Sequence, residues 1–210
     1  AALAVDGPRS MSGTLRGLRP GSNLIALYPS AGGAKVRLSV VVPVVPSGMG
    51  GARPGSMVVD CLTLAGTVLP QTTLTAAVVA AGTPVGGQPM PQHCVINGQM
   101  NPRVGEDGRN YHTGFQLRLP MDWNGRFLFR GGGGNDGAVQ AAVGGVTGFP
   151  AALARGFAVA STDGGHQGGG ATFRLDTQAR IDHAYAAYVR VTEASKALAA
   201  QAYGRPVDRS

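Results

Sequence analysis

The chain has 210 residues, enough for one ordinary domain with a single hydrophobic core and an appended segment. Its 34 Gly and 14 Pro approach the level of low-complexity chains, but 43% hydrophobic and 14% charged residues exclude disorder for most of the sequence. The longest apolar run, residues 38–45, is too short for a transmembrane helix, so no membrane partner is expected. The net charge of +7 comes from scattered cations, 16 Arg and two Lys, among only 6% aromatic residues, which argues against a nucleic-acid partner.

The N-terminal segment differs from the rest of the chain. The sequence begins without an initiating Met or a basic, apolar leader, so we expect a processed chain or a fragment. Within residues 1–56, to which no role is assigned, the β-branched run at residues 36–46 predicts a strand, and its two prolines confine that strand to a sheet edge or end. A Gly/Pro-rich linker is expected near residues 47–56. Residues 57–210 are therefore predicted to form the main domain.

The first half of this domain alternates short strands with turns. Strands are predicted at residues 74–81, 93–98 and 111–120, and the last of these alternates polar and apolar residues as a half-buried strand does. Segments rich in Gly and Pro, at residues 82–84 and 86–89, are typical of turns.

From Trp123 onward the pattern changes to alternating strands and helices. Strands at residues 126–129 and 156–161 flank a Gly-rich loop and a helical stretch, and a long amphipathic helix over residues 178–202 ends before Pro206, where another strand should begin. This order predicts a parallel α/β sheet with right-handed crossovers. The apolar or small residues of the long helix recur at 3.6-residue spacing, at Ile181, Ala184, Tyr185, Tyr188, Val191, Ser195 and Leu198.

The Gly-rich loop at residues 131–137 directly follows a predicted strand, the position where open α/β sheets bind ligands. In one interpretation, Gly132-x-Gly134-x-x-Gly137 is a dinucleotide fingerprint and Asp163 is the acid that binds a ribose. In a second, the N–H groups of the loop stabilise an oxyanion during acyl transfer. The third is a tight turn that binds no ligand.

Asp163 and His166 follow the next strand and suggest a catalytic base or a metal pair. Their spacing is not helical and no third ligand accompanies them, so we expect no metal and predict that both satisfy backbone groups of the loop. Asp176 and Asp182 lie near the start of the long helix, where negative charge suits the helix dipole. The remaining histidines are interpreted as surface or core residues: His93, His112 and His183.

The two cysteines, Cys61 and Cys94, are too far apart in sequence for a zinc knuckle or a thioredoxin-type redox site. The residues alone leave two alternatives. Both can be buried free thiols, or they can form one disulfide that stabilises the fold by about 3 to 4 kcal/mol and implies an exported protein.

A set of short motifs runs in unbroken order from about residue 61 to the end of the chain. The set resembles the tannase and feruloyl esterase family, which includes mono(2-hydroxyethyl) terephthalate hydrolase-like enzymes, and the resemblance covers no part of residues 1–60. The motifs are Cys61-x-x-Leu-x-Gly, Ala80-Ala-Gly-Thr-Pro, Gln92-His-Cys-Val-x-x-Gly98, Asp107-Gly-x-x-Tyr, Phe115-Gln-Leu-Arg-Leu-Pro-x-x-Trp-Asn-Gly-Arg-Phe, Gly131-Gly-Gly-Gly-Asn-Asp-Gly, Ser161-Thr-Asp-Gly-Gly-His and Leu175-Asp-x-Gln-Ala-Arg-Ile-Asp.

The resemblance implies the N-terminal portion of an α/β-hydrolase fold that hydrolyses phenolic-acid esters, such as feruloyl or galloyl esters, with a Ser-His-Asp triad. It implies that Gly134, beside Gly133, gives an oxyanion-hole N–H, and that Cys61 and Cys94 form the family's N-terminal disulfide. The expected location is secreted or periplasmic. No cofactor or metal is expected in this chain, because the calcium site of some family members lies in a downstream lid.

The sequence departs from the family at its end. The family's nucleophile lies in a Gly-Cys-Ser-x-Gly-Gly elbow a few residues beyond the position of Ser210, and no serine of this chain lies in Gly-x-Ser-x-Gly. We therefore expect an inactive front part of an esterase, truncated before the elbow, whose partners are the C-terminal remainder and a small aromatic ester. Two alternatives remain, a non-catalytic secreted binding module of the same fold and a nucleotide-binding α/β protein.

Overall fold

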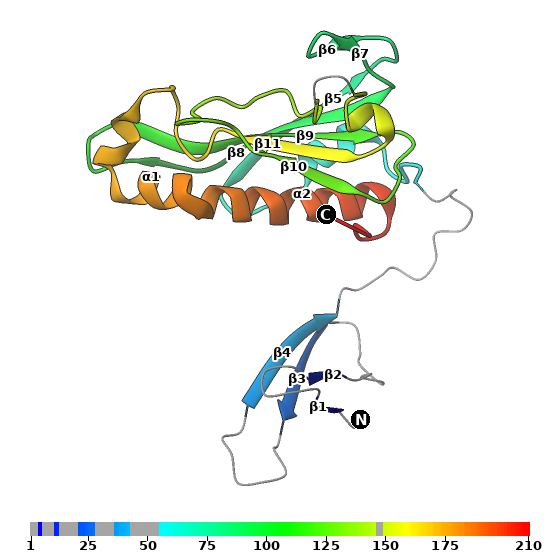
Figure 1. The fold of residues 1–210 in the computed structure, drawn as a ribbon, viewed down its shortest axis with the longest axis horizontal. Helices are drawn as coiled ribbons and strands as arrows, with labels where there is room; N and C mark the ends of the chain where they lie inside the picture. The colour runs from blue at the N-terminus through cyan, green and yellow to red at the C-terminus, as the bar shows by residue number, and fades with distance from the viewer. Residues whose placement is uncertain (1–3, 6–10, 13–20, 28–35, 43–54, 146–148) are drawn as a thin grey trace. The chain divides into compact units, whose positions relative to one another are not determined.

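The computed structural model describes residues 4–5, 11–12, 21–27, 36–42, 55–145 and 149–210, with side chains only in the last two ranges. The chain divides into two compact units, Ala1–Gly48 and Met49–Ser210 (Figure 1).

The described part of the first unit consists of two antiparallel strand pairs. The predicted strand at residues 36–46 is confirmed as β4, over Val36–Val42, whereas most of the linker predicted near residues 47–56 lies outside the described residues. The pairs are β1 (Ala4–Val5) with β2 (Met11–Ser12) and β3 (Gly21–Leu27) with β4.

The second unit is built on a five-stranded sheet with a long helix packed along one face (Figure 1). Its strands lie in the order β10-β11-β9-β8-β5, and a small hairpin, β6 (Pro84–Val85) and β7 (Gln88–Pro89), connects β5 to β8. The strands of the sheet are β5 (Thr72–Val79), β8 (His93–Val104), β9 (Asn110–Pro120), β10 (Phe127–Arg130) and β11 (Ala158–Thr162). The five strands that the sequence predicted between residues 74 and 161 are therefore all present, with β8 six residues longer than expected.

The prediction of a parallel sheet is wrong for most of these strands. Among the described pairs of the large sheet, only β10 and β11 are parallel, and the pairs β5–β8, β8–β9 and β9–β11 are antiparallel. The reason lies in the connections. A short turn, as at residues 105–109 between β8 and β9, can join only antiparallel neighbours, whereas the 27 residues between β10 and β11 are long enough for a parallel crossover.

The helical stretch predicted between the Gly-rich loop and β11 is also wrong. The described residues there form turns and bends, followed by a single 3₁₀ turn, η2 (Leu153–Arg155). Gly144 has a φ of 65° and is followed by Gly145 and, a few residues later, by Pro150. Such residues interrupt a helix, because Gly weakens it and Pro lacks the amide N–H.

The long helix is confirmed, but it contains a π-turn. After the 3₁₀ turn η3 (Ala171–Leu175), it consists of α1 (Thr177–Ile181), the π-turn η4 (Asp182–Ala186) and α2 (Ala187–Tyr203).

The π-turn changes which residues of the helix are buried. Val191, Ser195 and Leu198 are buried as predicted, whereas Ala184 and Tyr185 are exposed. A π-turn adds one residue to the turn, so the buried stripe passes from Asp182 to Ala187, five positions later. A strict 3.6-residue period therefore predicted the buried face only beyond the π-turn.

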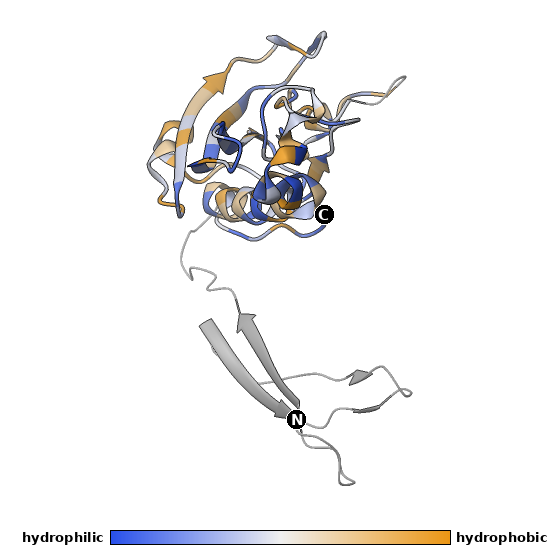
Figure 2. Cartoon of the chain, turned by 90° about the vertical axis from the view of Figure 1, so that its left-hand side faces the viewer, coloured by the Kyte–Doolittle hydropathy of each residue, from blue (hydrophilic) through white to orange (hydrophobic). Residues whose placement is uncertain are grey.

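The sheet is covered by apolar residues on both faces. One core cluster joins the sheet to α2, and within it Trp123 stacks on Tyr203 with ring centroids 4.2 Å apart. A smaller cluster lies on the segment before β11 and includes Val143, Leu153 and Val159. Polar and apolar residues alternate around α2 in Figure 2, as expected for an amphipathic helix on a sheet.

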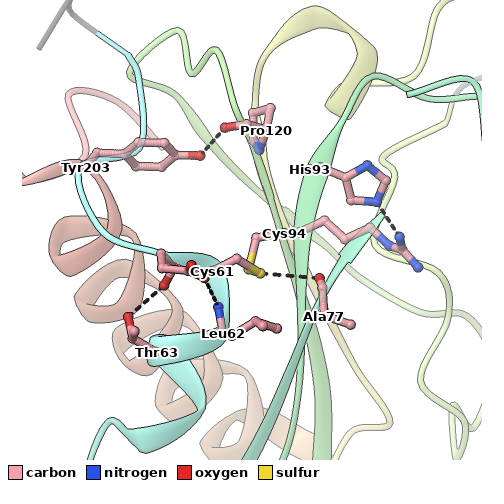
Figure 3. The surroundings of a disulfide bond; sticks show 10 residues. Cys61, Leu62, Thr63, Ala77, His93, Cys94, Pro120 and Tyr203 are labelled. Carbon is pink, nitrogen blue, oxygen red and sulfur yellow. Dashed lines mark hydrogen bonds between the residues drawn. A yellow bond between two sulfur atoms is a disulfide. The ribbon is translucent and has the colours of Figure 1, made fainter. Parts of the chain in front are cut away.

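Cys61 and Cys94 form a disulfide, as the family resemblance implied (Figure 3). Cys61 begins the 3₁₀ turn η1 (Cys61–Gly66), whose first backbone N–H groups are capped by Asp60, and Cys94 is fully buried in β8. The bond closes a 33-residue separation and links η1 to β8, an interior strand of the sheet. The alternative of two free thiols is therefore excluded.

The chain beyond Pro206 begins to pair with the edge of β10 that faces away from β11. Arg126 and Arg209 form a parallel bridge, in which the N–H of Phe127 donates to the carbonyl of Arg209 at 2.9 Å. The strand predicted to begin after Pro206 thus starts beside β10. The segment at Arg209, β10 and β11 lie side by side and run parallel to one another.

Asp176 joins the β8–β9 turn to the start of α1. Its buried carboxylate accepts hydrogen bonds from the guanidinium of Arg103 at 2.5 and 3.0 Å, from the N–H of Glu106 at 2.8 Å and from the N–H of Ala179 at 2.6 Å. Arg103 and these N–H groups hold the pKa of Asp176 well below its usual value. The position near a helix start was predicted, and Asp176 is the N-cap of α1.

Candidate active site at the carboxyl ends of the parallel strands

Two loops meet where β10 and β11 end. The Gly-rich loop, residues 131–137, follows β10, and the second loop, residues 163–170, follows β11. Because β10 and β11 are parallel, both loops leave the same edge of the sheet. The N–H of Gly137 donates to the carbonyl of Asp163 at 2.9 Å, and the N–H of Gly168 donates to the carbonyl of Gly137 at 2.8 Å. The two loops therefore form one continuous surface.

The Gly-rich loop curves around a polar cavity of about 330 Å³. Gly133, predicted beside the oxyanion donor, lines this cavity. Gly134 is exposed, with a φ of 62°, and it is not among the lining residues. The cavity is lined by Arg130, Gly131, Gly132, Gly133, Asp136, Ala138 and Gln140.

The loop leaves a run of backbone donors free. Within the part of the chain that the structure describes, the N–H groups of residues 131–135 have no hydrogen-bond acceptor, and the first that does is the N–H of Asp136, bonded to the carbonyl of Gly133 at 3.2 Å. Successive free N–H groups at a strand end form a concave site for negative charge. Chemically, this loop can bind an anion or a developing oxyanion.

Asp163 anchors the second loop and has no free oxygen. Its buried carboxylate accepts from the N–H of Gly114 at 2.9 Å, from the N–H of Gly165 at 2.8 Å and from the side-chain amide of Gln167 at 2.8 Å. Burial raises the pKa of Asp163 above its ordinary value, because it outweighs these neutral donors. The prediction that Asp163 satisfies backbone groups is confirmed.

The dinucleotide interpretation does not fit this geometry. It requires a free carboxylate for the ribose, but Asp163 is 2% exposed and already bonded. It also requires a helix whose N-terminus receives the pyrophosphate, and the described residues after Gly137 form turns.

His166 does not satisfy backbone groups, so this part of the prediction is wrong. The ring is 1% exposed and neither nitrogen has a hydrogen-bond partner among the described residues, although backbone of Gly164 and Asn135 lies close by. Its ring packs at a tilt against Phe173, with ring centroids 4.1 Å apart, and stands edge-on to His183, with ring centroids 5.2 Å apart. Burial, and secondarily His183, lower the pKa of His166, which favours the neutral ring.

Two of the other histidines border the second loop. The carbonyl of His112 accepts from the side-chain amide of Gln167 at 2.9 Å. The ring of His183 packs against Phe173.

His93 (Figure 3) is a core residue, as interpreted from sequence. Its Nδ1 lies 2.7 Å from the carbonyl of Pro91, and its Nε2 lies 2.6 Å from the guanidinium of Arg118. Burial lowers the pKa of His93.

Two side chains at the Gly-rich loop were not predicted to matter. Asp136 has a φ of 53° and receives a hydrogen bond of 2.6 Å from the hydroxyl of Tyr188 on α2. Arg130, the last residue of β10, donates to the carbonyl of Ala141 and borders the cavity. In the sequence, Tyr188 counted only as one apolar position of the helix. The acidic residue after a run of glycines was the available signal for Asp136.

The described ranges 55–145 and 149–210 contain no group of three or more His, Cys, Asp or Glu side chains arranged to hold a metal ion. In the same part of the chain, none of the helices combines the length and the apolar character needed to span a bilayer.

Comparison with known proteins gives a consistent result. Residues 94–210 match the model of the family described as tannase and feruloyl esterase. The chain is similar to the mono(2-hydroxyethyl) terephthalate hydrolase of Piscinibacter sakaiensis, at 42% identity over 142 aligned residues that take in 62% of this chain and 24% of that protein. It is also similar to an uncharacterized esterase of Agrobacterium fabrum, at 27% identity over 191 residues, or 84% of this chain and 34% of that protein.

Two solved structures share the fold. Feruloyl esterase B from Aspergillus oryzae superposes with a TM-score of 0.58 at 21% identity, over 71% of this chain and 31% of that one. An esterase from Aspergillus oryzae gives a TM-score of 0.56 at 22% identity, over 68% and 29% of the two chains. The predicted α/β-hydrolase fold is thereby confirmed. The chain spans about a quarter to a third of the length of the proteins it matches.

Proposed function

The chain belongs to the tannase and feruloyl esterase family, and from this premise we propose that it is part of a serine-type carboxylic ester hydrolase acting on aromatic-acid esters, such as feruloyl or galloyl esters. The observation that carries the proposal is the Gly-rich loop, whose free N–H groups line the carboxyl edge of a parallel strand pair.

In the proposed mechanism, these N–H groups stabilise the negative charge that develops on the ester carbonyl oxygen during acyl transfer. The N–H of Gly134 is the assigned donor, with Gly133 beside it. A donor of this kind is held in place before the reaction begins, so it needs no reorganisation, and one donor is typically worth about 2.7 to 4 kcal/mol in the transition state.

The remaining machinery is proposed to come from the remainder of the protein. Acyl transfer needs a nucleophile hydrogen-bonded to a base, and no serine of this chain lies in a nucleophile elbow. The segment beginning beside β10 at Arg209 runs parallel to β10, toward the edge from which the Gly-rich loop leaves. A nucleophile carried beyond it would face the loop. The 210 residues alone are expected to hydrolyse no ester.

We propose a secreted or periplasmic location. The supporting observation is the disulfide between Cys61 and Cys94, because structural disulfides form and persist in oxidising compartments.

The test compares two purified proteins, the 210-residue chain and the same chain continued by its C-terminal remainder. We expect the continued protein to hydrolyse methyl ferulate or methyl gallate and to lose this activity after treatment with a serine-directed inhibitor, while the 210-residue chain releases no acid. Binding of these esters by the continued protein without hydrolysis would support a non-catalytic binding module instead. Activity that resists the inhibitor would contradict the serine mechanism.

A further inference from the structure

Asp136 and Tyr188 form a contact directly behind the Gly-rich loop. The hydroxyl of Tyr188, on the first turn of α2, donates to Oδ2 of Asp136 at 2.6 Å. Tyr188 itself is held from the side by Phe129 of β10, with ring centroids 5.9 Å apart and edge-on geometry. The helix, the strand and the loop that follows the strand therefore meet at this hydroxyl.

The carboxylate of Asp136 occupies the space that a side chain at position 132 would need. A Cβ built on Gly132 would lie 1.3 Å from Oδ1 and 2.3 Å from the carboxyl carbon of Asp136. The backbone of Gly132 thus rests on the carboxylate. The left-handed conformation of Asp136, with a φ of 53°, turns its side chain back under the loop.

The other side of the contact is also closely packed, although less tightly. A Cβ built on Gly164, in the second loop, would lie 3.2 Å from the Tyr188 hydroxyl and 3.4 Å from Cβ of Asp136. The pair therefore lies between the two loops, with Asp136 also bordering the cavity. Burial, the hydrogen bond to Asp136 and the charge of Asp136 raise the pKa of Tyr188, so its hydroxyl keeps the proton that it donates.

We propose that Asp136 and Tyr188 are positioning residues for the oxyanion loop: Tyr188 fixes the carboxylate of Asp136, the carboxylate supports Gly132, and this support aims the N–H groups of Gly133 and Gly134 at the reacting carbonyl. The inference rests on the proposed function of this loop. Although Asp136 borders the cavity, in this scheme it and Tyr188 act on the loop and not on the reacting atoms.

The charge of Asp136 argues for the same role. A carboxylate beside an oxyanion repels it, so Asp136 cannot assist the reaction through its charge. What it supplies is shape and an acceptor for Tyr188. Asn has the same shape and an acceptor oxygen but no charge, and therefore separates positioning from charge.

The experiment uses the continued protein and four variants: Tyr188→Phe, Asp136→Ala, Asp136→Asn and, as a matched control, Tyr185→Phe. Tyr185 lies in the π-turn before Tyr188 and is 62% exposed, so loss of its hydroxyl should change nothing. With a methyl ferulate substrate, we expect kcat to fall about 10-fold in Tyr188→Phe and about 100-fold in Asp136→Ala, as misplaced catalytic groups do, with KM within about twofold. Asp136→Asn should keep kcat within about threefold of the parent.

Crystal structures of the parent, Tyr188→Phe and Tyr185→Phe proteins provide a second measurement that does not depend on activity. We expect residues 131–134 to be displaced or weakly ordered only in Tyr188→Phe.

Unchanged kcat in both Tyr188→Phe and Asp136→Ala, or an effect on KM alone, would overturn the proposal. So would an equal loss in Asp136→Asn and Asp136→Ala, because charge would then be the cause. If the parent hydrolyses no ester, the proposed function fails. The positioning of the loop is then decided by the crystal structures, and an unmoved loop overturns it.

Discussion

Asp176 and Asp163 each hold a loop in place through a buried carboxylate, but their partners differ in charge. Asp176 is 1% exposed and Asp163 is 2% exposed, and both accept hydrogen bonds from backbone N–H groups. Asp176 also pairs with the guanidinium of Arg103, whereas Asp163 receives only neutral donors, including the amide of Gln167.

The two carboxyl groups therefore shift in opposite directions. Arg103 lowers the pKa of Asp176, while burial raises the pKa of Asp163. Similar solvent exposure does not fix the sign of the shift: the guanidinium of Arg103 is the largest influence on Asp176, whereas burial in the protein interior is the largest influence on Asp163. The ion-paired junction lies at the β8–β9 turn, and the junction without a cation lies between the two loops of the candidate site.

The largest expected effect comes from breaking the ion-paired junction. Asp176→Ala leaves Arg103 without its ion-pair partner, removes the N-cap of α1 and leaves the N–H of Glu106 without its acceptor. We expect the free energy of unfolding to fall by about 3 kcal/mol, the lower end of the range for a buried pair, because the side chain of Arg103 is still 25% exposed. Denaturant-induced unfolding measures this loss.

Asp208→Ala is the control, because Asp208 pairs with Arg205 at the surface. Its expected cost is at most about 1 kcal/mol. A loss in Asp176→Ala no larger than in this control would show that the junction at the β8–β9 turn contributes no more than a surface ion pair.

The pH dependence of stability should separate the two junctions. The pKa of Asp176 falls on folding from its ordinary 3.8, so its stabilisation is complete above that value and is lost as the pH falls toward the lower folded-state pKa. The pKa of Asp163 rises on folding, so its contribution is complete below 3.8 and is lost as the pH rises through the raised folded-state pKa.

Asp176→Asn and Asp163→Asn each remove one of these contributions. Below pH 3.8, the deficit of Asp176→Asn relative to the parent should shrink as the pH falls. Above pH 3.8, the stability of Asp163→Asn relative to the parent should improve as the pH rises. Unfolding curves recorded between about pH 2 and 8 give both slopes. Slopes of the same sign would contradict the assignment of opposite shifts.

A smaller effect is expected in the Gly-rich loop itself. Gly134 has a φ of 62° and Gly133 does not have a positive φ, yet a Cβ on either would meet nothing within 4 Å. Gly134→Ala should therefore cost about 1 kcal/mol of stability through backbone strain alone, while Gly133→Ala should stay within about 0.5 kcal/mol of the parent. Equal unfolding temperatures for the two variants would argue against the left-handed conformation at Gly134.

The sequence predicted the elements that depend on local patterns. Such patterns predicted the strands at residues 93–98 and 111–120 and the long helix at residues 178–202, because the spacing of polar and apolar residues within each segment indicates its structure. The antiparallel direction of most strand pairs was not predicted. The lengths of the connections indicate whether two strands run parallel or antiparallel, but only after it is known which strands are neighbours in the sheet. The π-turn was missed because it adds one residue to a regular period without a distinctive residue type.

For the candidate site, the sequence predicted the features formed by consecutive residues but not the contacts between residues far apart in the chain. The strand-to-Gly-loop pattern and the second strand-end loop are visible in consecutive residues. The contact of Asp136 with Tyr188 joins residues 52 positions apart, and the bond of Asp163 to Gly114 spans 49. Such contacts depend on how the helix and strands pack, so no spacing rule could reveal them. The two cysteines alone left open whether they form a disulfide or remain free thiols. The disulfide was predicted only through the family resemblance.

The most direct test of the proposed function removes a single N–H group. Replacing Gly134 by glycolic acid in the continued protein turns its amide into an ester, which deletes the donor without adding a side chain. We predict that kcat for methyl ferulate falls by about 10² to 10³, while KM and the unfolding temperature stay close to those of the parent. A kcat equal to that of the parent would contradict the assignment of Gly134 as an oxyanion donor.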